Sequence, residues 1–155
     1  MHKNPYASAL GTIEPFRGLT ETPRKIKSLT QRWTARQWNR PYAPGKWTAR
    51  QIMVHLAQTE LALTTRVRFA AATPDYVAQP FDQDAWLPLE GADGPTAVDT
   101  YLALRRFNVA MFKNLTSQQR RQRFTHPEYG PLTPDWVAAQ IAGHELHHLA
   151  QLKTI

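Results

Sequence analysis

Four long stretches of this 155-residue chain each begin at a threonine that can cap a helix, and proline or glycine ends the first two of them. A capping threonine accepts a hydrogen bond from a backbone N–H that the first helical turn leaves unpaired. The spacing predicts long helices over 22–39, 48–72, 96–115 and 133–155. Four such helices, without strand-like alternation longer than a few residues, predict an all-α fold, a four-helix bundle.

The segments between the predicted helices are rich in proline and glycine. The longest of them, residues 73–95, contains four prolines and two glycines, and a connection of this length in a small domain is often functional. Short helical turns are predicted at 81–86 and 116–124, and a loop at 125–132. Residues 1–155 are predicted to form a single domain in which 1–19 is an extended N-terminal segment.

The composition excludes several kinds of protein and site. The chain has no cysteine, so disulfides and thiolate ligands are excluded, and any metal site must use histidine or carboxylates. The absence of cysteine is compatible with a reducing cytosol, and a cytoplasmic location is predicted. The sequence has no apolar run of the roughly 18 residues that span a membrane and no signal-like N-terminus. Neither a membrane span nor a signal peptide is therefore expected.

The formal net charge is +7, and a basic balance is one property of nucleic-acid-binding proteins. Lysine and arginine are nevertheless scattered through every segment, and the densest cluster, RRQRF at 120–124, is short. A solvated basic surface is therefore expected, and binding to nucleic acid is not. Arg66 and Arg68 are likewise expected on a solvated helix face, with carboxylate binding as the alternative.

Three histidines fall on the predicted inward faces of two helices. In steps of three and four residues, the apolar stripe of the last helix includes His144 and His148, and that of the 48–72 helix includes His55. A buried imidazole needs polar partners, and three neutral imidazoles that face one another can bind one divalent metal ion. Three packed core histidines are the alternative. His147 lies about 100° round the helix from His148 and is expected to be a neighbour rather than a ligand.

Two glutamates lie close to these histidines in the sequence. HELHH, residues 144–148, matches the H-E-x-x-H pattern in which glutamate is the general base of a metalloprotease, but so short a motif often occurs by chance. Glu145 is therefore expected to face solvent, with a hydrogen bond to a ligand ring as the alternative. Glu60 lies one step off the apolar stripe and is expected at the surface or in a capping role. His126 is expected to pack, with a place at the entrance of the site as the alternative.

Three segments together resemble a known family: RPYAPGKWTARQIMVHLAQTE, RFAAATPDYVAQPFDQDAWLP and HPEYGPLTPDWVAAQIAGHELHHLAQL. In this order they resemble the DinB-like superfamily, and most of all its YfiT-like branch, over residues 20–153. The resemblance implies a four-helix bundle, a homodimer, and a zinc, nickel or iron ion held by His55, His144 and His148. Relatives often carry a small or basic pair between the last two ligands, where this chain has Glu145 and Leu146.

The family to which the resemblance points is less uniform in its activity than in its metal site. Some members are transferases or isomerases that use a low-molecular-weight thiol, and the hydrolase label of others is not a demonstrated reaction. Thiol-dependent S-transfer to a small-molecule substrate is the expected function, in which the metal lowers the pKa of the thiol. One alternative is hydrolysis by a metal-activated water with Glu60 or Glu145 as base. The other is a metal-stabilised binding protein without catalysis.

Overall fold

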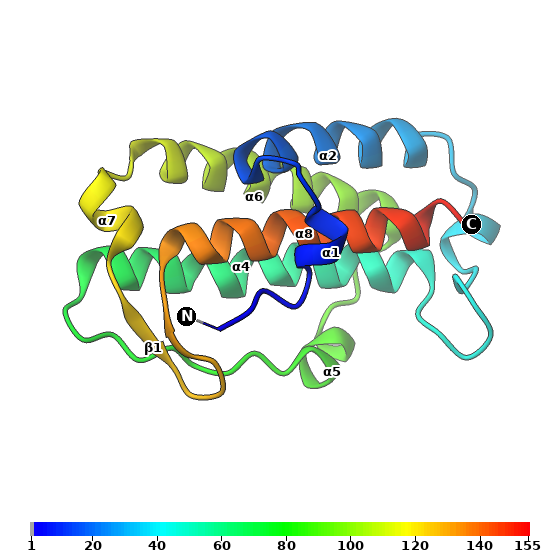
Figure 1. The fold of residues 1–155 in the computed structure, drawn as a ribbon. Coiled ribbons are helices and arrows are strands. Elements are labelled where there is room, and N and C mark those ends of the chain that lie inside the picture. Colours follow the sequence, from blue (N-terminus) through cyan, green and yellow to red (C-terminus); the bar gives the residue numbers. More distant parts are fainter. Residues whose placement is uncertain (1) are drawn as a thin grey trace.

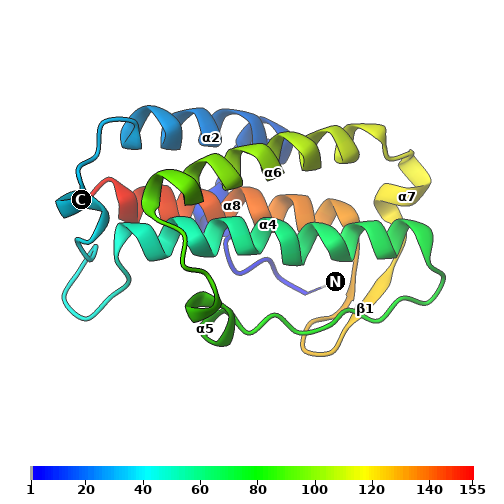
Figure 2. The same cartoon turned by 180° about the vertical axis from the view of Figure 1, so that it is seen from behind.

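The structure, a computed structural model, describes residues 2–155 and contains four long helices. These are α2 (Pro15–Thr30), α4 (Ala49–Ala72), α6 (Gly94–Asn114) and α8 (Pro134–Leu152). Helices α4 and α2 each pack against both α6 and α8, which makes a four-helix bundle (Figure 1). Helices α2 and α8 run in one direction and α4 and α6 in the other, because residues 73–93 return along the outside of the bundle (Figure 2). The predicted all-α four-helix bundle is confirmed.

The shorter elements lie at the ends and on one face of the bundle. They are α1 (Ala7–Leu10), α3 (Ala35–Trp38), α5 (Gln83–Trp86), the 3-10 helix η1 (Leu87–Leu89), α7 (Ser117–Arg121), β1 (Phe124–His126) and β2 (Gly130–Leu132). The turns predicted at 81–86 and 116–124 are therefore present as α5 and α7. None of the helices within residues 2–155 is long and apolar enough to cross a membrane.

The loop predicted at 125–132 is wrong in part, because it contains an antiparallel hairpin. Strands β1 and β2 pair with Thr125 opposite Pro131. The long connection also pairs with β1, since the Ala78 N–H donates to the Thr125 carbonyl at 2.8 Å and the Thr125 N–H donates to the Tyr76 carbonyl at 3.0 Å. Strands of three residues are too short for alternation to reveal them in the sequence.

The first long helix begins earlier and ends earlier than predicted. Helix α2 begins at Pro15, where the Glu14 carboxylate accepts hydrogen bonds from two free backbone N–H groups, and it ends at Thr30. Residues 35–38 form the separate helix α3, capped by Thr34. The extended segment predicted for residues 1–19 is therefore also wrong, because it contains α1 and the first turn of α2.

Helix α2 continues through Pro23, which the sequence placed at a helix start. Proline has no N–H, so the carbonyl four residues earlier, that of Leu19, loses its helical donor. The guanidinium of Arg105 on α6 donates to this carbonyl through Nη1 at 3.2 Å. A neighbouring helix thus supplies the bond that proline cannot make, and the helix does not end.

The helices that carry the histidines are placed as predicted. Helix α4 begins with a capping box between Thr48 and Gln51, and Thr133 caps α8 through the Trp136 N–H. Helix α6 starts slightly earlier than predicted, at Gly94, because the Asp93 carboxylate is its cap. All residues of the two predicted inward stripes are buried, namely Ile52, His55, Leu56, Thr59, Leu63, Val137, Ile141, His144, His148 and Leu152.

Helix α1 packs against α8, and a glycine permits the close approach. A Cβ atom at Gly143 would lie 2.6 Å from the carbonyl oxygen of Tyr6 and 2.9 Å from its Cβ. Separations below 3.0 Å from backbone atoms force one of the two segments to move. The absent side chain at Gly143 therefore sets the position of Tyr6.

Replacing Gly143 with alanine is expected to detach residues 2–12 from α8 while the bundle stays folded. Alanine is favoured over glycine inside a helix by about 1 kcal/mol, so α8 itself should not weaken. Amide hydrogen exchange should accelerate in residues 5–10 and stay slow in α4 and α8. Gly91→Ala is the matched control, since a Cβ there meets nothing within 4 Å. Unchanged exchange in residues 5–10 would contradict this account of the contact.

Candidate metal centre

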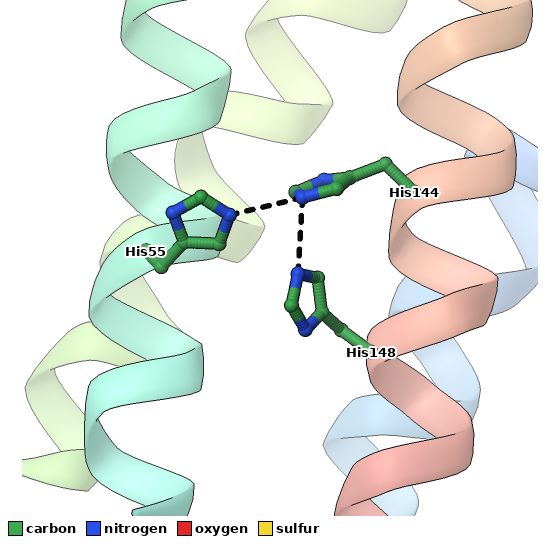
Figure 3. A group of neighbouring side chains, drawn as sticks. All are labelled: His55, His144 and His148. Carbon is green, nitrogen blue, oxygen red and sulfur yellow. Dashed lines mark hydrogen bonds between the residues drawn. The ribbon is translucent and has the colours of Figure 1, made fainter. Parts of the chain in front are cut away.

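The three histidines selected from the apolar stripes meet between α4 and α8 (Figure 3). The Nε2 atom of His144 lies 2.9 Å from Nε2 of His55 and 3.0 Å from Nε2 of His148. All three side chains are buried, and one nitrogen from each lies within 4.8 Å of the other two. The structure therefore brings together residues that are 89 positions apart in the sequence.

Burial keeps the three rings neutral at physiological pH. It lowers the pKa of His55 to about 3, with a further lowering by His148. It lowers the pKa of His148 to about 4 and holds the pKa of His144 well below its ordinary value. A neutral imidazole has one nitrogen with a free lone pair, which is the form that binds a metal ion.

A glutamine on the next turn of α8 selects the tautomer of His148. The Nδ1 atom of His148 lies 2.7 Å from Oε1 of Gln151, and Nε2 of Gln151 lies 3.0 Å from Nε2 of His147. With the amide nitrogen donating to His147, the amide oxygen of Gln151 accepts the proton on Nδ1 of His148. The lone pair of His148 is then on Nε2 and faces the other two histidines.

The donor set fits a divalent transition ion. A single ring proton can be donated well to only one partner, yet Nε2 of His144 has two nitrogens within 3.0 Å. The Nδ1 atoms of His55 and His144 are buried and have no hydrogen-bond partner among residues 2–155, so their polar interactions run through Nε2. Nitrogens about 2.05 Å from a tetrahedral ion lie about 3.3 Å apart. A shift of a few tenths of an ångström would open the cluster to that size.

His147 is a neighbour of the centre, as predicted, and it contacts the cluster through Gln151. The expected solvent-facing positions of Glu60 and Glu145 are wrong, because both carboxylates are buried. Arg105 reaches between them from α6, with Nη2 at 2.6 Å from Oε1 of Glu60 and Nη1 at 2.5 Å from Oε2 of Glu145. A cation from a third helix thus offsets two acidic side chains that the sequence pattern placed off the core.

Two neutral side chains complete this buried ionic cluster. Asn108 donates to Oε2 of Glu60 at 2.9 Å, and the Tyr101 hydroxyl donates to Oε2 of Glu145 at 2.6 Å. Burial raises the pKa of Glu145 to about 7 against the opposing effect of Arg105. Neither glutamate lines either of the two cavities that adjoin the histidines. Neither therefore has the geometry of a general base for a substrate bound there.

Two cavities adjoin the histidines. One, of about 210 Å³, is bordered by His55 and His144. The other, of about 390 Å³, is bordered by His148 and also by Trp47 and Lys46. Tyr6 and Gln83 line both cavities. The N-terminal segment and the 73–93 connection therefore form walls of the site.

Several residues of these walls differ from their predicted roles or were not predicted. Arg66 is buried and lines the smaller cavity, and Arg68 donates to Oδ1 of Asn108 at 2.9 Å, so the predicted solvated face is wrong. His126 is buried as expected and also lines the cavity. Tyr6 and Gln151 were missed. The spacing of Gln151, one turn after His148, was a usable signal, whereas no local pattern marks Tyr6.

A sequence model of the DinB superfamily matches residues 19–152. The chain belongs to the DinB superfamily. Among curated relatives, it is 27% identical over 138 residues to the Bacillus subtilis protein named "Putative metal-dependent hydrolase YfiT", covering 86% of this chain and 78% of the relative. It is 26% identical over 139 residues to "Putative metal-dependent hydrolase OB0782" of Oceanobacillus iheyensis, covering 88% of this chain and 81% of that protein.

The solved structures that match this chain are also four-helix bundles. The structure of YfiT from Bacillus subtilis, described as a probable metal-dependent hydrolase with an unusual four-helix bundle topology, matches with a TM-score of 0.82 and 27% identity, covering 90% of this chain and 82% of that one. TT2238, described as a four-helix bundle protein, matches with a TM-score of 0.60 and 22% identity, covering 97% of this chain and 99% of that one. The DinB-like resemblance inferred from the sequence is confirmed.

Proposed function

We propose that this chain is a metal-dependent enzyme in which His55, His144 and His148 hold one zinc, nickel or iron ion beside a small-molecule substrate. The observation that carries the proposal is the convergence of three buried Nε2 atoms, with neighbouring pairs 2.9 and 3.0 Å apart, at the wall of a cavity. Such an ion supplies Lewis acidity, which lowers the pKa of a nucleophile near the histidines. The relatives named as metal-dependent hydrolases support a metal at this position.

Aromatic side chains shield the histidines from water on two sides. The Trp47 ring lies 4.9 Å from the ring of His55 and 6.3 Å from that of His148, measured between centroids. Phe81 of the long connection stacks on His55 at 6.2 Å. Exclusion of water strengthens electrostatic interactions inside the site. Phe81 also lines the smaller cavity and Trp47 lines the larger one, so a substrate in either cavity lies beside an aromatic ring and a histidine.

The two cavities favour a reaction between two organic molecules. They lie against different histidines and share Tyr6 and Gln83, so one can hold a thiol and the other an electrophile. In this S-transfer a carbon–sulfur bond forms, the leaving group departs with its electron pair, and the thiol proton passes to solvent. Hydrolysis, which needs one organic substrate and water, is the second candidate, and the names of the relatives favour it.

Consumption of 1-chloro-2,4-dinitrobenzene with a panel of low-molecular-weight thiols tests the first candidate. We expect thiol-dependent turnover by the metal-loaded protein, loss of turnover in His55→Ala, and retention in His2→Ala, which removes an exposed histidine. Hydrolysis of 4-nitrophenyl acetate without thiol tests the second. Ester hydrolysis with no thiol-dependent reaction would replace S-transfer with hydrolysis. Failure of both reactions would favour a metal-stabilised binding protein.

Replacing Gln151 with leucine is expected to weaken zinc binding about 10- to 100-fold, the range measured for residues that orient metal ligands. The reason is that Nδ1 of His148 would lose the acceptor that keeps its lone pair on Nε2. The measurement is the zinc dissociation constant, obtained by competition with a chromophoric chelator. Gln118→Leu, at an exposed position of α7, is the control. Equal dissociation constants in wild type and Gln151→Leu would contradict an orienting role.

Three other expectations from the sequence stay predictions. They are the homodimer, the cytoplasmic location, and the single domain over residues 1–155. Sedimentation velocity on the untagged protein measures the first directly. A monomer at micromolar concentration would leave the site intact, because His55, His144 and His148 all come from one chain.

A further inference from the structure

Arg66 is a buried cation on which Glu128 acts through longer-range electrostatics rather than through an ion pair. Its side chain is 7% exposed, and no carboxylate within residues 2–155 forms an ion pair with it. Buried arginines are almost always paired, because an isolated charge in the interior is costly. Arg105, at 4% exposed, follows that rule with two glutamates. The contrast indicates that the partner of Arg66 is supplied from outside the chain.

The guanidinium of Arg66 is held in place at the cavity wall. Nη2 donates to the Gln79 carbonyl at 2.7 Å, which uses one of its five N–H donors. Arg66 lines the same 210 Å³ cavity as His55 and His144. Glu128, the acidic residue of this wall, is exposed on the hairpin turn and forms no ion pair with Arg66. The remaining N–H groups of the Arg66 guanidinium are available to a ligand in the cavity.

A second donor lies on the same wall. Nδ1 of His126 accepts a hydrogen bond from the Glu128 N–H at 3.2 Å, so the proton of the neutral ring is on Nε2. Burial and the charge of Arg66 both lower the pKa of His126, which keeps the ring neutral. The ring stacks on Tyr129 with centroids 4.7 Å apart, and this contact fixes its orientation. Arg66 and His126 thus offer one positive charge and a neutral N–H donor.

We propose that Arg66 and His126 form a subsite for a carboxylate group of the substrate. A planar guanidinium binds a carboxylate through two parallel hydrogen bonds, and one positive charge matches one carboxylate rather than a phosphate dianion. This inference deepens the proposed function, because it assumes that the reacting group lies at the histidines. The expected substrates are small organic acids in which the reactive group is separated from the carboxylate.

The spacing along α4 sets a lower limit on the size of that substrate. Arg66 follows His55 by 11 residues, which is three helical turns on the same face and about 16 Å along the axis. Long side chains on a helix lean toward its N-terminus, so Arg66 leans toward His55. The carboxylate and the reacting atom are therefore separated by several bonds, and an acid as small as acetate cannot reach both places.

The subsite is tested by titrating ¹⁵N-labelled, zinc-loaded protein with sodium butyrate at constant ionic strength. We expect saturable shifts of the Arg66 Nε–H signal and of the backbone signals near Arg66 and His126. The dissociation constant should rise at least tenfold in Arg66→Gln and stay unchanged in Arg32→Gln, an exposed arginine. Butyramide should cause no shift. Equal butyrate binding in Arg66→Gln, or tighter binding of inorganic phosphate than of butyrate, would overturn the proposal.

A second arm links the subsite to the reaction. With 2-mercaptoethanol as the thiol, 4-chloro-3-nitrobenzoate and 4-chloro-3-nitrobenzamide differ only in the carboxylate. We expect a lower KM for the benzoate in wild type, and a rise of at least tenfold in Arg66→Gln for the benzoate alone. Equal KM values in wild type would overturn the assignment of the substrate class. If neither compound reacts, S-transfer fails as the proposed reaction, and the titration still decides whether the subsite exists.

Discussion

Replacing His144 with alanine is expected to reduce bound transition metal from near one ion per chain to a small fraction. His144 occupies the middle of the cluster, with Nε2 within 3.0 Å of both other rings. Loss of a residue that only orients a ligand costs 10- to 100-fold in affinity, so loss of a ligand should cost more than about 100-fold. The measurement is metal content by mass spectrometry after gel filtration of the untagged protein, followed by the zinc dissociation constant.

The matched control is His2→Ala, which removes an exposed imidazole but none of the three converging nitrogens. It should keep near one ion per chain. If wild type takes up no zinc, nickel or ferrous iron, or if His144→Ala retains the ion, the three histidines are packed core residues and the enzyme proposal falls with the site. Far-ultraviolet circular dichroism distinguishes that outcome from unfolding of the variant.

Replacing Arg105 with alanine is expected to lower the free energy of unfolding by about 3–5 kcal/mol, the usual cost of removing one partner of a buried ion pair. Glu60 and Glu145 would remain in the core without their cation, and the Leu19 carbonyl would lose its donor. In a chain of this length the cost corresponds to a fall in Tm of about 10 °C. Urea denaturation and calorimetry on the metal-free protein measure both quantities.

Arg106→Ala removes the same charge from an exposed position of α6 and should change the free energy of unfolding by less than about 0.5 kcal/mol. The deficit of Arg105→Ala should shrink as the pH falls from 8 to 5. Burial already raises the pKa of Glu145 to about 7, and loss of the opposing Arg105 charge raises it further, so protonation stabilises the folded variant more than the folded wild type as the pH falls. A deficit that is the same at both pH values would show that lost packing, rather than charge, is responsible.

The histidine centre could be predicted because it follows from helical periodicity alone. His55, His144 and His148 each occupy a position where an apolar residue would fit the stripe, and the capping threonines Thr48 and Thr133 fixed both helices. Burial of one face then required the rings to meet between α4 and α8. Local spacing was sufficient because the partners of each ring are the other two rings.

The polar core could not be predicted, because its partners come from a third helix. Glu60 and Glu145 lie beside the apolar stripes, and only Arg105 of α6 makes their burial tolerable. The start of α2 was misplaced for the same reason, since Pro23 is accepted inside the helix where Arg105 bonds to the Leu19 carbonyl. Both errors arise from one side chain whose position depends on the tertiary structure.

The contacts of Arg105 also define the smallest set of helices with which this site could be transferred to another protein. Its histidines come from α4 and α8 only, which suggests that a designer could transplant two helices into another bundle. Each of those helices carries a buried glutamate that is tied to α6, Glu60 on one and Glu145 on the other. A graft of α4 and α8 alone would import two unpaired acids within a turn or two of the imidazoles. The transferable module is therefore three helices, with α6 as the member that carries no histidine.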